Sequence, residues 1–245
     1  MAAALETHNL TKHFGDSVAV DRVSFAIERG VTTALLGGNG AGKTTTIAML
    51  LGLVAPTSGE IRILGMDPAR QGSAARARMN FQSPYVDMPK RLTVRRNLSI
   101  YAKLYGVPHA REKVEAVAEA LQLTPLLKRR TGSLSAGQAT RVGIAKALVN
   151  DPDVLLLDEP TASLDPDTAD WVRGELEAYQ TRSGAAILLA SHNMAEVERL
   201  AGRVLMMKQG RLVDDAAPAD LVKKYGRANL EEVFLQIARR EEAAQ

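Results

Sequence analysis

A glycine-rich segment near the N-terminus has the residue types and the spacing that bind nucleotide phosphates. It lies between a predicted strand and a predicted helix and fits G-x-x-x-x-G-K-[ST], with the sequence Gly37-Gly38-Asn39-Gly40-Ala41-Gly42-Lys43-Thr44 followed by Thr45. Glycines let the backbone turn tightly and bring N–H groups to phosphate oxygens, and the following helix presents its positive end to the same anion. We expect Lys43 to reach the β- and γ-phosphates and the Thr44 hydroxyl to hold Mg²⁺. By itself the segment fits kinases, GTPases, ATPases and motors.

A pair of acids at the end of an apolar run narrows this choice. Asp158 and Glu159 directly follow the run at 154–157, and the carboxyl ends of strands in open α/β sheets are where ligands bind. Asp158 can hold Mg²⁺ through its water shell, whereas Glu159 can orient and deprotonate a water that attacks the γ-phosphate. The alternative is that the two acids simply begin a solvated loop before Pro160. Beside an intact phosphate loop, the pair favours hydrolysis of a bound nucleotide.

The elements that must position these residues alternate along the chain. Apolar runs predict strands at 18–27, 31–36, 61–64, 154–157, 185–190 and 204–207. Helical patterns lie between them at 43–51, 167–180 and 194–200. Strands that alternate with helices indicate an α/β fold with a mainly parallel sheet.

The stretch from about 84 to 150 breaks this alternation because it contains helical patterns and no convincing strand. A helix is predicted over 94–104, and an apolar stripe follows at 114, 117, 118 and 121. A third helix is predicted over 135–149, with Ser135 as its N-cap. The tail, 216–240, is again helical in pattern, with a break at Gly226. We therefore expect an α/β core with an inserted all-helical subdomain.

Composition excludes several classes of protein. The 245 residues contain no cysteine, which rules out disulfides, thiol nucleophiles and Cys-ligated metals. The net charge of +3 is too weak to argue for nucleic-acid binding. The N-terminus lacks the pattern of a signal peptide, and the longest uncharged apolar stretch, 47–55, is far too short to span a membrane. We expect a cytoplasmic protein whose membrane role requires another chain.

The third inserted helix opens with a second anion-binding pattern. Serine and small residues at a helix start leave N–H groups and a positive helix end available, and this segment is Leu134-Ser135-Ala136-Gly137-Gln138. At this point the chain resembles the ATP-binding subunit of ABC transporters, whose signature is LSGGQ, with Ala136 in place of the first glycine. The phosphate loop, signature and acidic strand follow one another in the family's order along essentially the whole chain.

The resemblance implies roles for five further residues. Phe14 matches the aromatic residue that stacks on adenine, usually Tyr in the family; the alternative is a core phenylalanine. Gln82 matches the glutamine that senses Mg²⁺ and the attacking water, and His192 matches the histidine that contacts the γ-phosphate. Ser163 and Asp165 match the loop that communicates across a dimer, a role compatible with capping the helix that follows.

The resemblance also implies a fold and partners. The family has a P-loop NTPase core that includes an N-terminal antiparallel β portion. In this chain the ATP-binding core would be residues 1–83 and 151–215. The helical signature subdomain would be 84–150 and a C-terminal helical extension 216–245. Two subunits would face each other head to tail, and ATP would join the P-loop of one to the signature of the other. The intact motifs of this chain favour a homodimer, and a heterodimer is the alternative. Separate integral membrane permease subunits would dock on the helical insertion, at the inner face of the cell membrane. The segments 191–194 and 230–235 resemble those of exporters whose ATPase and membrane subunits are separate chains.

Three other functions are alternatives to transport. An ATPase of the same superfamily that acts on nucleic acid or ribosomes usually carries two cassettes or a long coiled-coil insertion, and this chain has neither. A GTPase would need a guanine-recognition motif of the NKxD type, which is absent. A module that binds without hydrolysing ATP is disfavoured by Glu159. The sequence therefore predicts an ATPase that powers transport, with no nucleic-acid partner.

Overall fold

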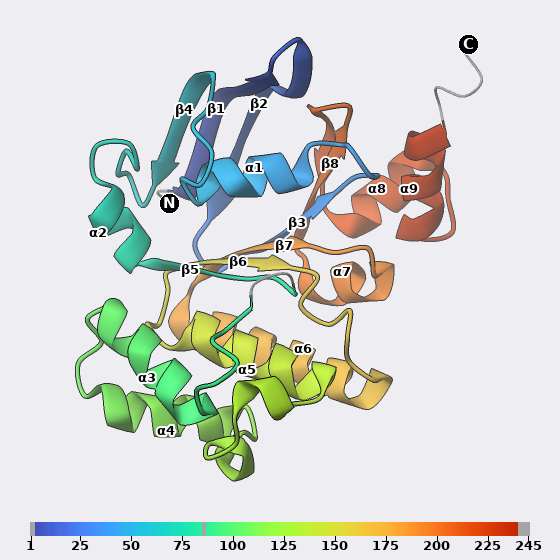
Figure 1. Cartoon of the computed structure of the whole chain (residues 1–245). Helices are drawn as coiled ribbons and strands as arrows, with labels where there is room; N and C mark the ends of the chain where they lie inside the picture. The colour runs from blue at the N-terminus through green and yellow to red at the C-terminus, as the bar shows by residue number, and fades with distance from the viewer. Residues whose placement is uncertain (1–2, 85–86, 240–245) are drawn as a thin grey trace. The chain divides into compact units, whose positions relative to one another are not determined.

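The computed structural model describes residues 3–84 and 87–239, and the chain divides into two compact units (Figure 1). One unit comprises Met1–Arg76 and Ala186–Gln245, and the other comprises Ala77–Ala185. The mainly parallel strands and the separate antiparallel strands confirm the predicted α/β class with an N-terminal antiparallel portion. In the described part of the chain, no helix combines the length and the apolar character that crossing a bilayer requires.

The antiparallel sheet of the first unit is built from the N-terminal strands. Its order is β2-β1-β4, with β1 over Ala3–Phe14, β2 over Ser17–Glu28 and β4 over Ser58–Ile63. The sequence patterns predicted β2 and β4 but not β1. Strand β1 mixes polar and apolar residues and its pairing with β2 shifts register several times, so no clean alternation marks it. Pairing on both sides makes it a strand.

The parallel strands of the first unit carry the phosphate loop. Strand β3 (Thr32–Leu36) is fully buried and pairs in parallel with β7 (Ala186–Ala190) on one side and β8 (Arg203–Lys208) on the other. Strand β9 (Arg211–Ala216) pairs antiparallel with β8 and was not predicted. Continuous apolar runs in β7 and β8 are buried, as strands covered on both faces require.

Helices of the first unit follow these strands closely in sequence. Helix α1 spans Lys43–Leu50 and α7 spans Met194–Leu200, as predicted to within one residue, and α2 (Gly72–Ala77) ends at the boundary of the unit. The C-terminal tail forms α8 (Pro218–Tyr225) and α9 (Leu230–Arg239), separated at Gly226, which adopts a left-handed conformation. Leu230, Val233 and Ile237 of α9 are buried in one core with residues of β3, β8 and α7. The tail is therefore an integral part of this unit.

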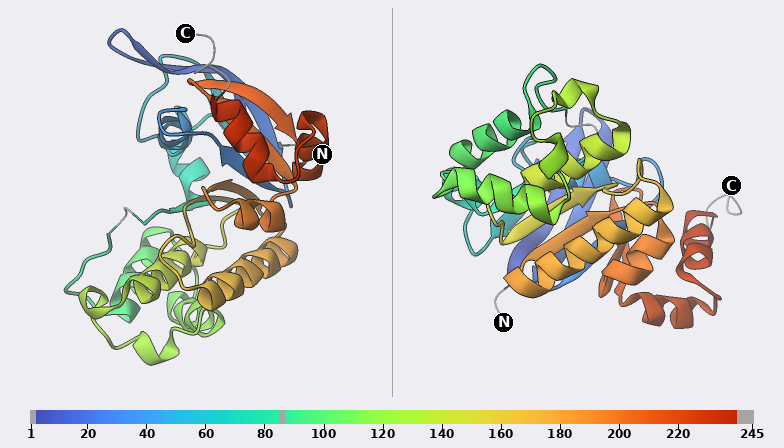
Figure 2. Two further views of the ribbon diagram at one scale, coloured as in Figure 1. Left: turned by 90° about the vertical axis from the view of Figure 1, so that its right-hand side faces the viewer. Right: turned by 90° about the horizontal axis from the view of Figure 1, so that it is seen from below.

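The second unit joins a two-stranded parallel ladder to a group of helices. Strands β5 (Met79–Gln82) and β6 (Val154–Asp158) pair in register, so that Gln82 lies opposite Leu157. Helices α3 (Val94–Leu104), α4 (Ala110–Ala120) and α5 (Ala136–Leu148) pack together as the predicted all-helical segment, followed by α6 (Pro166–Ser183) (Figure 2). The predicted apolar stripe of α4 is buried, and Thr93 caps α3.

Candidate functional site

The glycine-rich segment forms the connection between β3 and α1. Lys43 is the first residue of α1, and its Nζ donates to the carbonyl oxygens of Gly37 at 2.5 Å and Gly38 at 3.2 Å. The amide of Gly210 in the β8–β9 turn donates to the Ala41 carbonyl at 3.1 Å, which ties the loop to its neighbour. The ammonium therefore lies within the segment that the sequence predicts to wrap phosphates.

Gly42 could not readily be another residue. It caps α1 with φ at 99°, in the left-handed region, where side chains other than glycine are strained. A Cβ at this position would lie 2.6 Å from the carbonyl oxygen of Ala19 in β2. The loop can therefore pack against β2 and enter α1 only because this position has no side chain.

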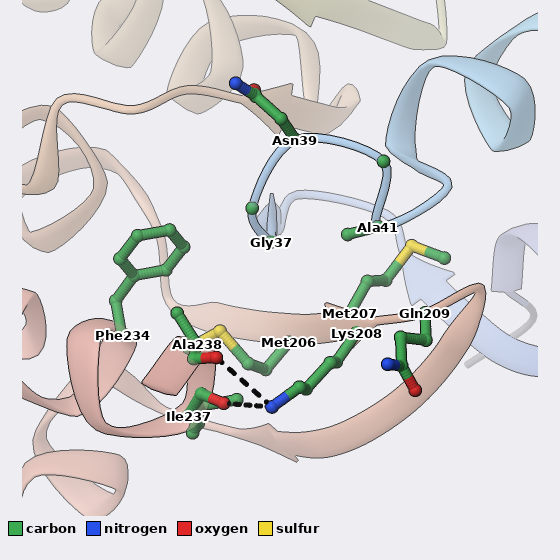
Figure 3. A pocket seen from close by; sticks show the side chains of 12 residues that line it. Gly37, Asn39, Ala41, Met206, Met207, Lys208, Gln209, Phe234, Ile237 and Ala238 are labelled. Carbon is green, nitrogen blue, oxygen red and sulfur yellow. Dashed lines mark hydrogen bonds between the residues drawn. The ribbon is translucent and has the colours of Figure 1, made fainter. Parts of the chain in front are cut away.

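A cavity of about 420 Å³ lies beside the phosphate loop, on the side that faces the C-terminal helix (Figure 3). Its walls are the loop from Gly37 to Ala41, the end of β8 and helix α9. Lys208 crosses it and donates from Nζ to the carbonyl oxygens of Ile237 at 2.7 Å and Ala238 at 3.3 Å. A cation at the carboxyl end of α9 complements the negative end of the helix dipole. The sequence patterns did not predict that α9 lies beside the phosphate loop.

Two further predicted residues belong to the same unit. Phe14 ends β1 and is 53% exposed, so it is not a core residue, and the Nζ of Lys12 lies 5.0 Å from its ring centroid. His192 is exposed and follows β7, the parallel neighbour of β3. Because β3 and β7 are parallel, His192 and the phosphate loop follow strand ends that point in the same direction.

The carboxyl ends of β5 and β6 bring the predicted glutamine and acids of the second unit close together. Ser83, next to Gln82, donates from Oγ to Oδ2 of Asp158 at 3.2 Å. The Gln82 side chain is buried and its Nε2 donates to the Ser83 carbonyl at 3.1 Å. The segment after β5 is therefore linked to the first acid through Ser83, a residue that the sequence analysis did not single out.

Glu159 has an unusual backbone conformation. Its φ is 49°, in the left-handed region that residues other than glycine rarely adopt. Such strain costs about 1–3 kcal/mol and clusters at functional sites, where the surrounding structure holds it. Both Asp158 and Glu159 are partly exposed, so their carboxylates remain accessible at the end of a buried strand.

The signature begins α5 with the predicted cap. The Ser135 hydroxyl accepts a hydrogen bond from the Gln138 amide, and the Gln138 side chain accepts one from the Ser135 amide, which completes a capping box. Ser135 and Ala136 are exposed. Asp165 caps α6 by accepting from the Thr168 amide at 3.0 Å, and this bond holds the pKa of the Asp165 carboxyl below its ordinary value. The simpler, capping explanation for Asp165 is therefore correct, and it leaves a second role open.

A second cavity, of about 330 Å³, joins predicted residues that lie far apart in the sequence of the second unit. Its lining includes residues of the β5 end, the signature, helix α5 and the loop before α6, namely Gln82, Ser83, Leu134, Ala136, Gly143 and Ser163. Each unit thus contains its own group of the predicted site residues. The phosphate loop, Phe14 and His192 lie in the first unit, and the remaining predicted residues lie in the second.

The family model described as "ABC transporter" matches residues 20–162. The chain belongs to the ABC transporter family. It is 38% identical over 234 residues to Nod factor export ATP-binding protein I of Paraburkholderia xenovorans (strain LB400), an alignment that covers 95% of this chain and 77% of the relative. The protein of the same name from Rhizobium etli is 36% identical over 223 residues, covering 89% of this chain and 70% of the relative.

Solved structures of ABC cassettes have the same fold. An ATP-binding subunit of an ABC transporter aligns with a TM-score of 0.88 at 27% identity, covering 95% of this chain and 98% of that chain. The cassette cbiO1 from Clostridium perfringens, part of the transporter complex cbiONQ, aligns with a TM-score of 0.81 at 29% identity, covering 100% and 99%. This ABC cassette is an ATPase subunit that binds and hydrolyses ATP to power transport across a membrane.

Proposed function

We propose that this ABC cassette drives export by closing as an ATP-bound homodimer on separate membrane permease subunits. The relatives described above are named for the export of Nod factor, and cbiO1 is part of a multi-subunit complex. The cassette MJ0796, whose 23% identity and TM-score of 0.79 support the fold alone, has a dimeric structure bound to ADP and Pi. The nucleic-acid alternative is not favoured, because these relatives are transporter subunits.

The observation that carries this proposal is the exposed, capped start of α5. Helix α5 has 13 residues, and its exposed N-terminus, capped by Ser135, is suited to bind the phosphates of a second subunit's nucleotide. A γ-phosphate bound there makes contacts that ADP cannot make, and such differential affinity is what ligand-driven closure requires. A change from 1:99 to 99:1 in favour of the closed dimer takes about 5.5 kcal/mol. Hydrolysis removes the contact, and the dimer opens.

Each site residue has a role in this scheme. Residues Gly37–Thr45 hold the phosphates, and the exposed ring of Phe14 stacks on adenine. Glu159 orients a water and accepts its proton as the water attacks the γ-phosphate, while His192 contacts that phosphate. Ser163 and Asp165 communicate across the dimer.

Mg²⁺ is the metal that suits the ligands proposed from each of the two units. Asp158 offers a carboxylate that already accepts a hydrogen bond from Ser83, and Thr44 offers an exposed hydroxyl in the first turn of α1. Together with the Gln82 amide oxygen these are the hard oxygen ligands that Mg²⁺ prefers. When bound, the ion neutralises charge on the phosphate oxygens.

The permease subunits would dock on the helical insertion around Gln82 and hold the cassette at the inner face of the cell membrane. In functional terms, 1–83 and 151–215 would form the ATP-binding core, 84–150 the signature subdomain and 216–245 the extension. Opening and closing of the dimer would then move the helical insertion and, through it, the transport path.

The test is the dependence of dimerisation and turnover on nucleotide. In Glu159→Gln, ATP should produce a dimer in size-exclusion chromatography and ADP should not, whereas the control Glu119→Gln, at an exposed position of α4, should behave as wild type. Full turnover by a strictly monomeric chain at high dilution would refute the dimer. For direction, the cassette and its permease would be reconstituted in proteoliposomes. Substrate that moves toward the cassette's side of the bilayer would refute export.

A further inference from the structure

Lys146 is a buried lysine in the last turn of α5, the helix that begins at the signature. Only 6% of its surface is exposed, and its Nζ donates a hydrogen bond of 2.5 Å to the carbonyl oxygen of Phe81, the residue before Gln82. The same ammonium lies 5.7 Å from the ring centroid of Tyr101 on α3. A charge-assisted bond in a buried setting is among the stronger hydrogen bonds that a protein makes. The ammonium therefore joins α5 to the last residues of β5.

Neighbouring residues strengthen the same junction. The Asn80 side chain on β5 donates from Nδ2 to the Lys146 carbonyl at 3.2 Å and to Oδ1 of Asn150 at 2.7 Å. One turn before Lys146, a Cβ on Gly143 would lie 2.5 Å from both Nε2 and Oε1 of the Gln82 side chain. The amide of Gln82 thus lies directly against the backbone of α5, and it can do so because this position is glycine.

We propose that Lys146 is a positioning residue for ATP hydrolysis, because its bond to the Phe81 carbonyl fixes the end of β5 on α5 and thereby fixes Gln82. The proposal rests on the proposed roles of Gln82 and the signature. Ser135 begins the helix that Lys146 occupies 11 residues later, about 16 Å along the helix at 1.5 Å per residue. In the closed homodimer, the signature binds the nucleotide of one site while Gln82 acts at the other. Helix α5 is then a rigid connection between the two sites.

The first experiment measures the junction itself, without ATP. Hydrogen exchange of the backbone amides at 79–83 is compared in wild type, Lys146→Met, Lys146→Arg and the control Lys103→Met, an exposed lysine on α3. Exchange in this segment should be faster than in wild type only in Lys146→Met, because the local contact is lost. Exchange of the amides in the β1–β2 sheet should be the same in all four proteins, because the fold is retained. Wild-type exchange in Lys146→Met would overturn the proposal.

The second experiment measures turnover. We expect Lys146→Met to lower kcat about 10- to 100-fold, the usual effect of misplacing a group near the reacting atoms, and to leave the KM for ATP unchanged. Lys146→Arg, which keeps a buried donor, should restore most of kcat. Wild-type kcat in Lys146→Met, a change confined to KM, or equal loss in the Met and Arg variants would each overturn the positioning role.

Gly143→Ala provides an independent test at the same junction. Alanine is the better helix former, so loss of helix stability would not account for a defect. The new Cβ must displace the Gln82 amide, and kcat should fall with the KM for ATP unchanged; wild-type kcat would count against the proposal. Gln82→Ala separates the proposed role of Gln82 from the contact that Lys146 makes. Wild-type turnover in Gln82→Ala would refute the proposed role of Gln82, whereas the exchange experiment still decides whether Lys146 holds β5 on α5.

Discussion

The buried ammonium of Lys146 should make stability rise with pH over a defined range. Burial lowers the pKa of Lys146 to about 8 in the folded chain, whereas a lysine in an unfolded chain has a pKa of about 10.4. Between these two values the unfolded chain binds more protons than the folded chain, so the free energy of unfolding increases with pH. The cost of burying the charge is fully present below about pH 8 and is relieved as pH rises toward about 10.4.

The size of the effect follows from the two pKa values. Their difference corresponds to about 3 kcal/mol in total, at about 1.4 kcal/mol per pH unit, and about 2 kcal/mol of this is gained by about pH 9.5. Burial raises the pKa of Tyr105 and of Tyr179, so both tyrosines oppose the trend once the unfolded chain begins to lose its phenolic protons near about pH 10. The range from pH 7 to about 9.5 is therefore the informative one.

Urea unfolding at pH 7, 8, 9 and 9.5 measures this directly, with pH values chosen on either side of about 8. Lys146→Met removes the buried charge and leaves the Phe81 carbonyl without this donor, a loss of about 1–3 kcal/mol that the removed desolvation cost offsets. We expect this variant to fold and to lack the pH-dependent gain, which the exposed control Lys103→Met should retain. Parallel stability curves for wild type and Lys146→Met would refute the reasoning.

Three further predictions concern the active site and the C-terminal helices. Glu159→Gln should retain ATP binding and lose about 10²- to 10⁴-fold in turnover, the usual worth of a general base; unchanged phosphate release would remove Glu159 from that role. Lys43→Ala should weaken ATP binding itself in calorimetric titration, because its ammonium is expected to contact the β- and γ-phosphates; wild-type affinity would contradict this. Burial by itself would raise the pKa of the Asp214 carboxyl, but hydrogen bonds from Lys224 and Tyr225 of α8 outweigh it and hold the pKa below its ordinary value. The stability that this carboxylate contributes is present above about pH 4 and is lost as pH falls through its lower folded pKa. Asp214→Asn should therefore make stability depend less on pH in acid unfolding followed by circular dichroism. An acid-unfolding profile identical to that of wild type would show that Asp214 does not contribute to this pH dependence.

Local patterns in the sequence determined the helices and the phosphate loop. The predicted helix over 94–104 matches α3, the predicted helix over 194–200 matches α7, and the Ser135 cap is present. A cap, a glycine break or an apolar stripe involves residues within about four to seven positions of one another, so the information lies in the segment itself. The order of the phosphate loop, signature and acidic strand was readable for the same reason and sufficed to indicate the family.

Tertiary structure decided what local patterns could not. Strands β1, β5 and β9 have weak signals of their own and exist because neighbouring strands pair with them. Contacts between Ser83 and Asp158, and between Lys146 and Phe81, join residues that are 75 and 65 positions apart. Such contacts depend on strand register and helix packing, which are properties of the folded chain. The residue types that could do chemistry were thus visible in the sequence, while the groups that hold them in place became visible only in the fold.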